Sequence, residues 1–222
     1  MKNQTLTMKG MKNMKAAGSA WLVLAAVVVS ACSSGPGPVD DSGHHDRTRA
    51  MRIEKDLWFR ASDESPLLPE ARATFTALSY YDIRPEFRVP SFLTLESAGP
   101  PVVIQLETST GVMRRMRKVG ALGFALGATK YRLTAFADAD TRTVDRLFVP
   151  FGDLTNKDET YGGGRYLDLD RTPTGLYNLD FNRAYHPYCV YNPNTECPVP
   201  PRENRLQVAI PAGERLPPNG GK

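Results

Sequence analysis

Residues 159–205 hold most of the side chains in this chain that could take part in chemistry. Asn178, Asp180 and Asn182 are spaced two apart, so on a β-strand they would place three oxygen-bearing side chains on one face. Such a face could bind a polar ligand, or it could be buried and paired with arginines in a structural hydrogen-bond network. Both interpretations fit the sequence. The candidate ligand-binding residues are Glu159, Arg165, Asp168, Asp180, Asn182, Tyr185 and Asn204.

Two stretches of the sequence resemble a metal-binding or cofactor-binding motif, but each lacks residues that the motif requires. The spacing from Asn178 imitates the start of an EF-hand calcium loop, but Arg183 stands where the turn glycine is needed and Cys189 where the bidentate glutamate is needed. The run 162–164 is three glycines without the lysine and hydroxyl residue of a P-loop, so it predicts a tight turn with permissive dihedral angles. We expect neither a bound metal nor a cofactor.

Cys189 and Cys197 enclose seven residues and are the only cysteines besides Cys32. In an exported domain such a pair most simply forms a disulfide, which would stabilise the fold by about 2.5 kcal/mol if loop-closure entropy is the cause. The alternative is a zinc site that adds His186 and a carboxylate, although this spacing matches no common zinc pattern.

Catalytic signatures are weak in this sequence. His186 is the only histidine outside the first 46 residues, no Gly-x-Ser-x-Gly elbow occurs, and Cys189 would have to escape pairing to act as a nucleophile. A hydrolase that uses carboxylates such as Glu159, Asp168 or Asp180 as acid and base is the enzymatic alternative. The sequence favours a protein that is not an enzyme.

Residues 1–31 have the three parts of an export signal. Four lysines precede an apolar run over residues 20–29, which is too short to span a bilayer, and small residues lead to Cys32. The sequence Val29-Ser30-Ala31-Cys32 resembles a bacterial lipobox, in which the cysteine thiol receives lipid. We therefore expect a lipoprotein anchored to a bacterial membrane through Cys32, facing the periplasm from the outer membrane if the cell has two membranes. The alternative is an ordinary cleaved signal.

Removal of the signal changes the charge of the chain. Four of the 28 basic residues lie ahead of Cys32, where no carboxylate occurs, so 24 basic and 24 acidic residues remain. This even balance lacks the electrostatic footprint of nucleic-acid binding, and we expect no nucleic-acid partner. The expected partners are the membrane, through the lipid, and a small polar ligand or envelope component.

One basic run remains within the domain, at residues 114–118. It predicts a solvated edge strand that its charges protect from aggregation. The alternative is a surface for anionic membrane headgroups.

The rest of the chain predicts a flexible tether at 32–46, one domain at 47–216 and a disordered tail at 217–222. A helix is expected from about Arg47, with Ile53 and Leu57 at helical spacing, and a short second helix from Pro69. After Tyr80 the period changes to two, which predicts strands at 87–95, 102–107, 112–119, 120–126, 130–137, 146–151, 164–169, 175–181 and 206–210.

Short strands separated by turns every eight to twelve residues are typical of antiparallel folds. We predict a mainly β domain, an antiparallel β roll, barrel or sandwich with one or two short N-terminal helices. Such a fold must bring the separate strands of the stretch 159–205 together if they are to form one site.

Several runs of the sequence resemble one uncharacterised prokaryotic family. They are Phe148-Val149-Pro150-Phe151, 159–168, 179–185, Pro187-Tyr188-Cys189 and 203–206. These runs are similar to the family catalogued as domain of unknown function 1684, over nearly the whole domain, and the export signal would make this chain a lipoprotein member. The resemblance implies no established activity, substrate or catalytic residue. His186 stands where the family leads us to expect asparagine, which argues against a mechanism that needs an imidazole there.

We therefore expect a lipid-anchored protein of the cell envelope that binds a polar small molecule, glycan or envelope component at the surface made by residues 159–205. A carboxylate-dependent hydrolase at the same surface is the first alternative. A structural or interaction module without a ligand pocket is the second.

Overall fold

The computed structural model describes residues 42–96, 99–141, 143–170 and 176–217. The predicted signal, Cys32, most of the predicted tether and residues 218–222 of the predicted tail lie outside the described residues. Helix α1 (His44–Ala61) contains residues 44–46, which the sequence had assigned to the tether, so the folded domain begins earlier than predicted. Helix α2 (Pro69–Thr74) starts at the predicted proline, whose fixed φ suits a first helical position.

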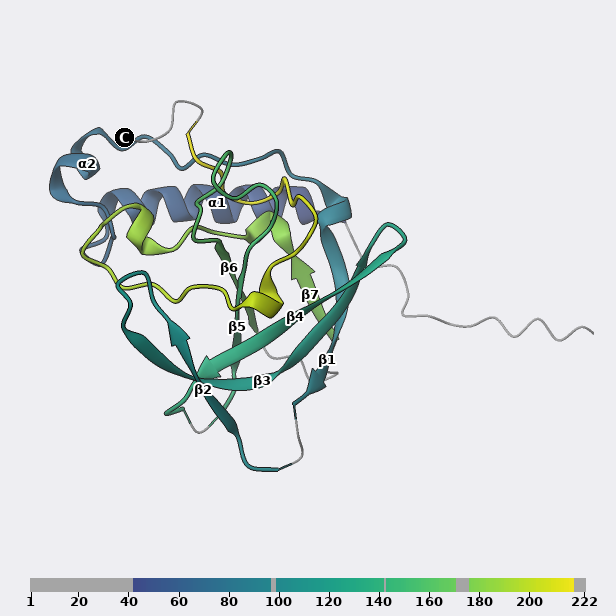
Figure 1. Cartoon of the computed structure of the whole chain (residues 1–222). Coiled ribbons are helices and arrows are strands. Elements are labelled where there is room, and N and C mark those ends of the chain that lie inside the picture. The colour runs from purple at the N-terminus through teal and green to yellow at the C-terminus, as the bar shows by residue number, and fades with distance from the viewer. Residues whose placement is uncertain (1–41, 97–98, 142, 171–175, 218–222) are drawn as a thin grey trace, which may run out of the picture. The chain divides into compact units, whose positions relative to one another are not determined.

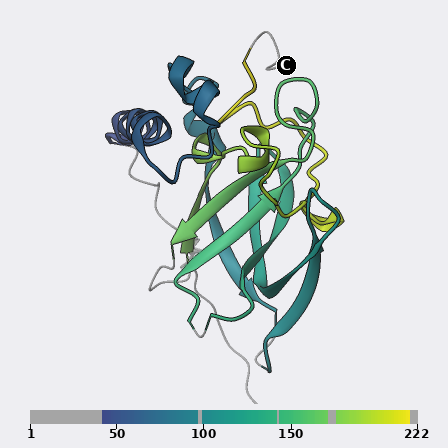
Figure 2. The same ribbon diagram turned by 90° about the vertical axis from the view of Figure 1, so that its left-hand side faces the viewer.

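Seven strands of the described chain form one antiparallel sheet (Figure 1). They are β1 (Arg88–Leu95), β2 (Val102–Glu107), β3 (Met113–Leu126), β4 (Thr129–Asp138), β5 (Arg146–Phe151), β6 (Arg165–Asp170) and β7 (Leu176–Asp180). Their order is β6-β5-β4-β3-β1-β7, and β2 pairs with β3. The sheet curls into a nearly closed, barrel-like arrangement (Figure 2), which confirms the prediction of a mainly antiparallel β fold.

β3 is central to the sheet because it contacts three strands. Residues 113–118 pair with β2, residues 120–123 pair with β1, and the opposite edge pairs with β4. The two strands predicted at 112–119 and 120–126 are one strand with a register shift between Lys118 and Gly120. Gly120 fits there because a Cβ would collide with the Thr94 carbonyl oxygen. Residues 116–118 of the basic run thus pair on both sides, where the prediction of an edge strand is wrong, whereas Arg114 and Arg115 pair with β2 alone.

One face of the sheet is covered by a large apolar cluster. Alternate residues of β5 and β6 contribute to it, as the period of two in a strand requires: Leu147, Val149, Phe151, Leu167 and Leu169. The cluster also includes Phe181, Leu206, Ile210 and Ala212, so the C-terminal segment helps to close the core.

Residues 206–210 do not form the predicted strand. The segment makes a few backbone hydrogen bonds with residues 152–154: the Leu206 N–H donates to the Gly152 carbonyl at 2.8 Å, and the Val208 carbonyl accepts the Leu154 N–H at 3.2 Å. At Ile210 buried side chains take over, because its N–H donates to Asp153 Oδ2 at 2.6 Å and its carbonyl accepts from Arg165 at 2.8 Å. The apolar alternation that suggested a strand therefore reflects burial of an extended segment whose backbone pairing is too short and irregular to form one.

α1 lies across one end of the sheet (Figure 1). Its buried residues are His44, Thr48 and Phe59, whereas Ile53 and Leu57 are 52% and 56% exposed. The helix is present as predicted, but the two apolar residues that indicated it do not face the core. The helix is oriented by polar contacts that an apolar pattern does not reveal, among them Arg52, which donates to the carbonyls of Tyr81 and Asn182. Neither this helix nor any other in the described part is long and apolar enough to cross a bilayer.

Candidate functional site

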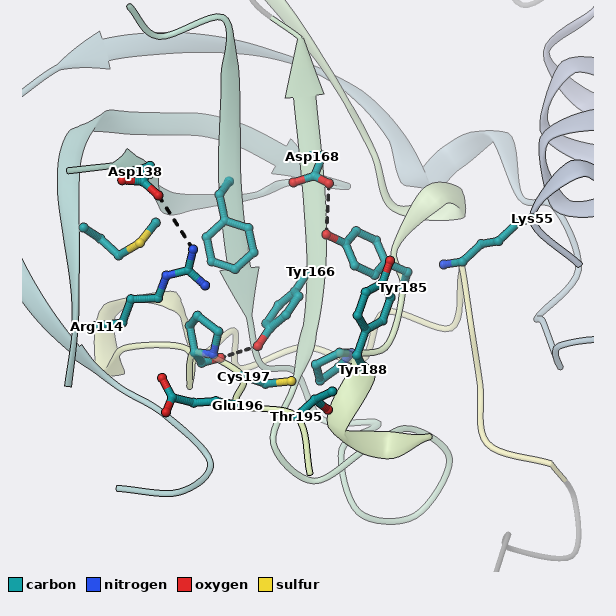
Figure 3. A pocket seen from close by; sticks show the side chains of 14 residues that line it. Lys55, Arg114, Asp138, Tyr166, Asp168, Tyr185, Tyr188, Thr195, Glu196 and Cys197 are labelled. Atoms are coloured by element: carbon teal, nitrogen blue, oxygen red, sulfur yellow. Dashed lines mark hydrogen bonds and ion pairs between the residues drawn. The ribbon is translucent and has the colours of Figure 1, made fainter. Parts of the chain in front are cut away.

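A pocket of about 720 Å³ opens beside β5 and β6 (Figure 3), a size that suits a small-molecule ligand. Its walls come from α1, from strands β3 to β6 and from the segment 185–198. The lining residues are Lys55, Arg114, Met116, Asp138, Phe148, Tyr166, Asp168, Tyr185, Pro187, Tyr188, Thr195, Glu196, Cys197 and Pro198.

Strand geometry explains why three of these side chains share the pocket. Tyr166 and Asp168 are two residues apart on β6, so they project from the same face, and Phe148 is the register partner of Asp168 on β5. Leu167 and Val149 project from the opposite face into the large apolar cluster. The core pattern of β5 and β6 therefore places the pocket residues on the other face of the sheet.

Aromatic rings form the apolar part of the pocket wall. The rings of Phe148 and Tyr166 meet edge to face with centroids 4.8 Å apart, and Tyr166 meets Tyr185 in the same way at 5.7 Å. Tyr188, from the 3₁₀ turn η3 (Tyr188–Val190), stacks on Trp58 at 6.3 Å and is 42% exposed. Tyr188 is therefore the ring best placed to meet a ligand that enters from solvent.

Charged groups of both signs flank these rings. Figure 3 shows Arg114 and Asp138 at one side of the pocket and Lys55 at the other. Arg114 lies 3.8 Å from Asp138, and Lys55 Nζ donates to the buried Glu214 at 2.6 Å. The pocket thus offers hydrogen-bond donors and acceptors around an apolar centre, an arrangement typical of sites for polar small molecules.

Asp168 and Tyr185 form a hydrogen-bonded pair in the pocket wall. The Tyr185 hydroxyl donates to Asp168 Oδ2 at 2.9 Å. Desolvation by the pocket walls raises the pKa of Asp168, although the hydrogen bond from Tyr185 opposes this shift, and burial raises the pKa of Tyr185 as well. A carboxyl group in this environment can accept a hydrogen bond from a ligand and, once protonated, can donate one.

Cys197 lies in the pocket wall beside Cys189, and both are free thiols in the structure. The Cys189 N–H donates to Cys197 Sγ at 3.1 Å, and the Tyr161 hydroxyl lies 3.9 Å from Cys189 Sγ. The hydrogen bond from Cys197 lowers the pKa of Cys189 to about 6, and the same contact raises the pKa of Cys197. The predicted disulfide is not formed here, but the two side chains are in direct contact.

His186 is a buried, neutral histidine. Its Nε2 accepts the N–H of Tyr161 at 3.3 Å, and burial lowers its pKa to about 4. The backbone N–H of His186 donates to Glu214 Oε2 at 2.7 Å. Within the described ranges, no three His, Cys, Asp or Glu side chains are grouped so that they could hold a metal ion.

Of the predicted ligand-binding residues, Asp168 and Tyr185 line this pocket. Arg165 is fully buried elsewhere: it contacts Asp153 Oδ2 at 3.2 Å and donates to three main-chain carbonyls, those of residues 210, 212 and 214. Its ionic partner is therefore Asp153, which was not among the candidate residues.

Asn182 and Asn204 are also fully buried and join separate segments. Asn204 accepts the Thr134 N–H at 2.7 Å and donates to the carbonyls of Thr134 and Pro150. Asn182 accepts the Arg84 N–H at 2.8 Å and donates to the Arg84 carbonyl. Both amides therefore form hydrogen bonds with backbone groups. This agrees with the second interpretation of the sequence, a buried structural hydrogen-bond network.

The two remaining candidates lie apart from the pocket. Asp180 is buried and accepts from His44 Nε2 at 2.8 Å, while Glu159 is exposed on a loop. The single polar face expected for Asn178, Asp180 and Asn182 does not form, because β7 ends at Asp180 and Asn182 belongs to the turn η2 (Phe181–Arg183).

Sequence reasoning missed several lining residues of the pocket, including Lys55, Phe148, Tyr166 and Tyr188. The alternation of Tyr166 and Asp168 with Leu167 could have indicated a shared face on β6. Lys55 left no local signal, because it reaches the pocket from α1, over a hundred residues earlier in the chain.

A small antiparallel β domain with an N-terminal helix and a ligand-sized pocket beside β5 and β6 is the class that this fold defines. Residues 73–215 match the family described as "Protein of unknown function (DUF1684)", and the chain belongs to that family. This confirms the resemblance found in the sequence.

A solved structure supports the same fold. The solution NMR structure of an uncharacterised protein from Haloarcula marismortui is 38% identical, with a TM-score of 0.62. The similarity covers 79% of this chain and 97% of the other. No curated protein matches the chain.

Proposed function

We propose that this protein is a lipid-anchored protein of the cell envelope whose domain binds a polar small molecule, most suitably a glycan, in the pocket lined by Tyr166, Asp168 and Tyr188. The observation that carries the proposal is the combination of aromatic rings, of which Tyr188 is exposed, with hydrogen-bonding groups in one cavity of about 720 Å³.

A saccharide fits this combination chemically. A sugar ring presents C–H groups on its faces and hydroxyls around its edge, so an aromatic ring can cover a face while carboxylates accept from the hydroxyls. Tyr188 offers such a ring, and Asp168 and Glu196 offer carboxylates in the same lining. Lys55 and Arg114 add donors for a ligand that also carries oxygen acceptors.

A carboxylate-dependent hydrolase at the same pocket is the second candidate function. It is favoured by one observation: Asp168, whose pKa is raised, shares the cavity with the carboxylates of Asp138 and Glu196. Two carboxyl groups in different environments can divide the roles of acid and base.

Substitution of Tyr188 tests the pocket. We expect Tyr188→Ala to weaken the binding of a glycan about 5- to 30-fold, because it removes about 1–2 kcal/mol of ring contact while the remaining walls stay in place. The ligand comes from a thermal-shift screen of N-acetylglucosamine oligomers and glucose oligomers, and calorimetry then measures the affinity of each hit.

Tyr131→Ala is the matched control, because Tyr131 also stacks on one aromatic ring, that of Phe124, and lies outside the pocket. Equal affinity for every hit in the wild type, Tyr188→Ala and Asp168→Asn proteins would refute the proposal. Mass analysis of the same samples separates the two functions: cleaved glycan with the wild type and intact glycan with Asp168→Asn supports the hydrolase.

The anchor and the thiol pair are tested together in cells. The sequence at 29–32 supports lipidation of Cys32, and the contact between Cys189 and Cys197 supports a disulfide once the domain is exported. We expect cells fed an alkyne-tagged fatty acid to label the wild-type chain and the Cys189→Ser chain but not Cys32→Ser. Intact mass of the purified wild type should then rise by two hydrogens on reduction.

The two results are independent of each other. Label on Cys32→Ser, or no label on the wild type, would refute the anchor. A mass unchanged by reduction would refute the disulfide, and in that case the Cys189 thiol should alkylate with a midpoint near pH 6, as its lowered pKa implies.

A further inference from the structure

A second, smaller pocket lies at the start of α1, away from the candidate site. It has a volume of about 310 Å³, and its lining includes His44, Arg47, Thr48, Arg88, Asn178 and Arg183. None of these residues lines the pocket around Tyr188. The volume is sufficient for one phosphate-sized group together with the atoms attached to it.

Three separate elements bring arginines to this pocket. Arg47 stands in the first turn of α1, Arg88 is the first residue of β1, and Arg183 is the last residue of η2. β1 and β7 pair so that Arg88 is opposite Asp180, which places the end of β7 beside the helix. Residues 47, 88 and 183 are far apart in the sequence, so no local motif predicts that they line one pocket.

The charge of the pocket is positive. Asp180 is the only carboxylate in its lining, and this carboxylate is already occupied by His44 at 2.8 Å and by the amide and backbone N–H of Asn182. Three arginines thus line the pocket together with one buried, fully hydrogen-bonded carboxylate. Arg47 Nη1 donates to the Ser42 carbonyl at 2.9 Å and Arg183 Nε contacts Met51 Sδ at 3.3 Å, and each of these guanidinium groups has further N–H donors. The positive end of the α1 dipole lies at the same place, since His44 is the first residue of the helix.

We propose that this pocket binds a phosphate-type oxyanion, either the phosphate of a membrane lipid headgroup or a free phosphate. Guanidinium groups match the oxygens of phosphate in paired hydrogen bonds, and an excess of positive charge favours an anion over a neutral ligand. Asn178 and Thr48 add uncharged groups that can bind the remaining oxygens.

The proposal that the phosphate belongs to a membrane lipid rests on the proposed anchor at Cys32. The proposal that the pocket binds a phosphate-type oxyanion does not depend on that anchor. Cys32 and His44 are twelve residues apart, a chain length that spans at most about 40 Å. A domain anchored through Cys32 would therefore keep this pocket within reach of the headgroups. A free phosphate requires no such anchor.

The test compares two pairs of substitutions in the full chain carrying Cys32→Ser. Arg47→Gln with Arg183→Gln changes the pocket, and Arg49→Gln with Arg202→Gln is the matched control, because these two arginines are also exposed but lie outside it. Calorimetry measures binding of inorganic phosphate and pyrophosphate. Co-sedimentation measures binding to vesicles of phosphatidylglycerol and phosphatidylcholine relative to phosphatidylcholine alone.

We expect the pocket variant to lose affinity about 10-fold or more, since two charge-assisted contacts are removed, and the control to stay within about twofold of the parent chain. If the pocket variant loses affinity only for vesicles, the ligand is the lipid headgroup. If it loses affinity for phosphate or pyrophosphate, the ligand is soluble. The proposal is overturned if the parent binds none of these probes, or if both variants lose equally. Tyr188→Ala should leave these affinities unchanged, so failure here is separate from failure of the glycan proposal.

Discussion

Arg165→Met is expected to lower the free energy of unfolding by about 3–5 kcal/mol, the range found when one partner of a buried ion pair is removed. The side chain is fully buried and contacts Asp153 at 3.2 Å. Its guanidinium also donates to the carbonyls of residues 210, 212 and 214. Methionine fills a similar volume but leaves one carboxylate and three carbonyls without this donor.

Urea denaturation at neutral pH measures the effect, and the melting temperature should fall by about 10 °C or more. Arg202→Met, at an exposed arginine, is the matched control and should change the free energy by less than about 0.5 kcal/mol. A loss below about 1 kcal/mol for Arg165→Met would show that the buried pair is not needed for the fold.

Asn204→Ala is expected to cost about 3 kcal/mol. The amide of Asn204 is fully buried and serves three backbone groups, the Thr134 N–H and the carbonyls of Thr134 and Pro150. Each buried group left without a partner costs about 1–3 kcal/mol. The same denaturation experiment applies, with Asn178→Ala as the control because Asn178 is exposed.

Asn204→Asp gives a finer test of the hydrogen bonds that join Asn204 to Thr134 and Pro150. Aspartate keeps the acceptor for the Thr134 N–H but loses the amide donors, so it should remain as unstable as alanine or become more so. A variant as stable as the wild type would mean that the carbonyls of Thr134 and Pro150 do not depend on Asn204.

Both predictions concern residues that the sequence offered as ligand contacts. A polar residue in a run of turns gives the same sequence signal whether it binds a ligand or a buried backbone group, because both roles need the same donors and acceptors. The structure separates the roles by burial: Arg165 and Asn204 are enclosed, whereas Asp168 faces the pocket.

The strands were predictable because their apolar residues alternate. Six of the predicted ranges match β1, β2, β4, β5, β6 and β7 to within a residue or so, and the short turn at 108–111 is present. The register shift inside β3 was not predictable, since it depends on β1 and β2 sharing one edge of that strand. Long-range pairing of this kind leaves no local trace in the sequence.

The sites were harder to predict than the strands. Each pocket is assembled from segments far apart in the chain, with Lys55 beside Tyr185 in one and Arg47 beside Arg183 in the other. The exposed positions of Ile53 and Leu57 show the same limit. The buried contacts of α1 come from Phe59 and from the polar side chains of Arg52 and Lys55, not from those two apolar residues.

The contacts of the C-terminal segment also bear on when the domain can fold. The three carbonyl acceptors for Arg165 and the carboxylate that binds Lys55 lie within residues 210–214. The core around Arg165 therefore cannot be completed until residues 210–214 have been synthesised and have left the ribosome. For a precursor exported as proposed, a chain that still lacks these contacts is easier to translocate than a closed domain.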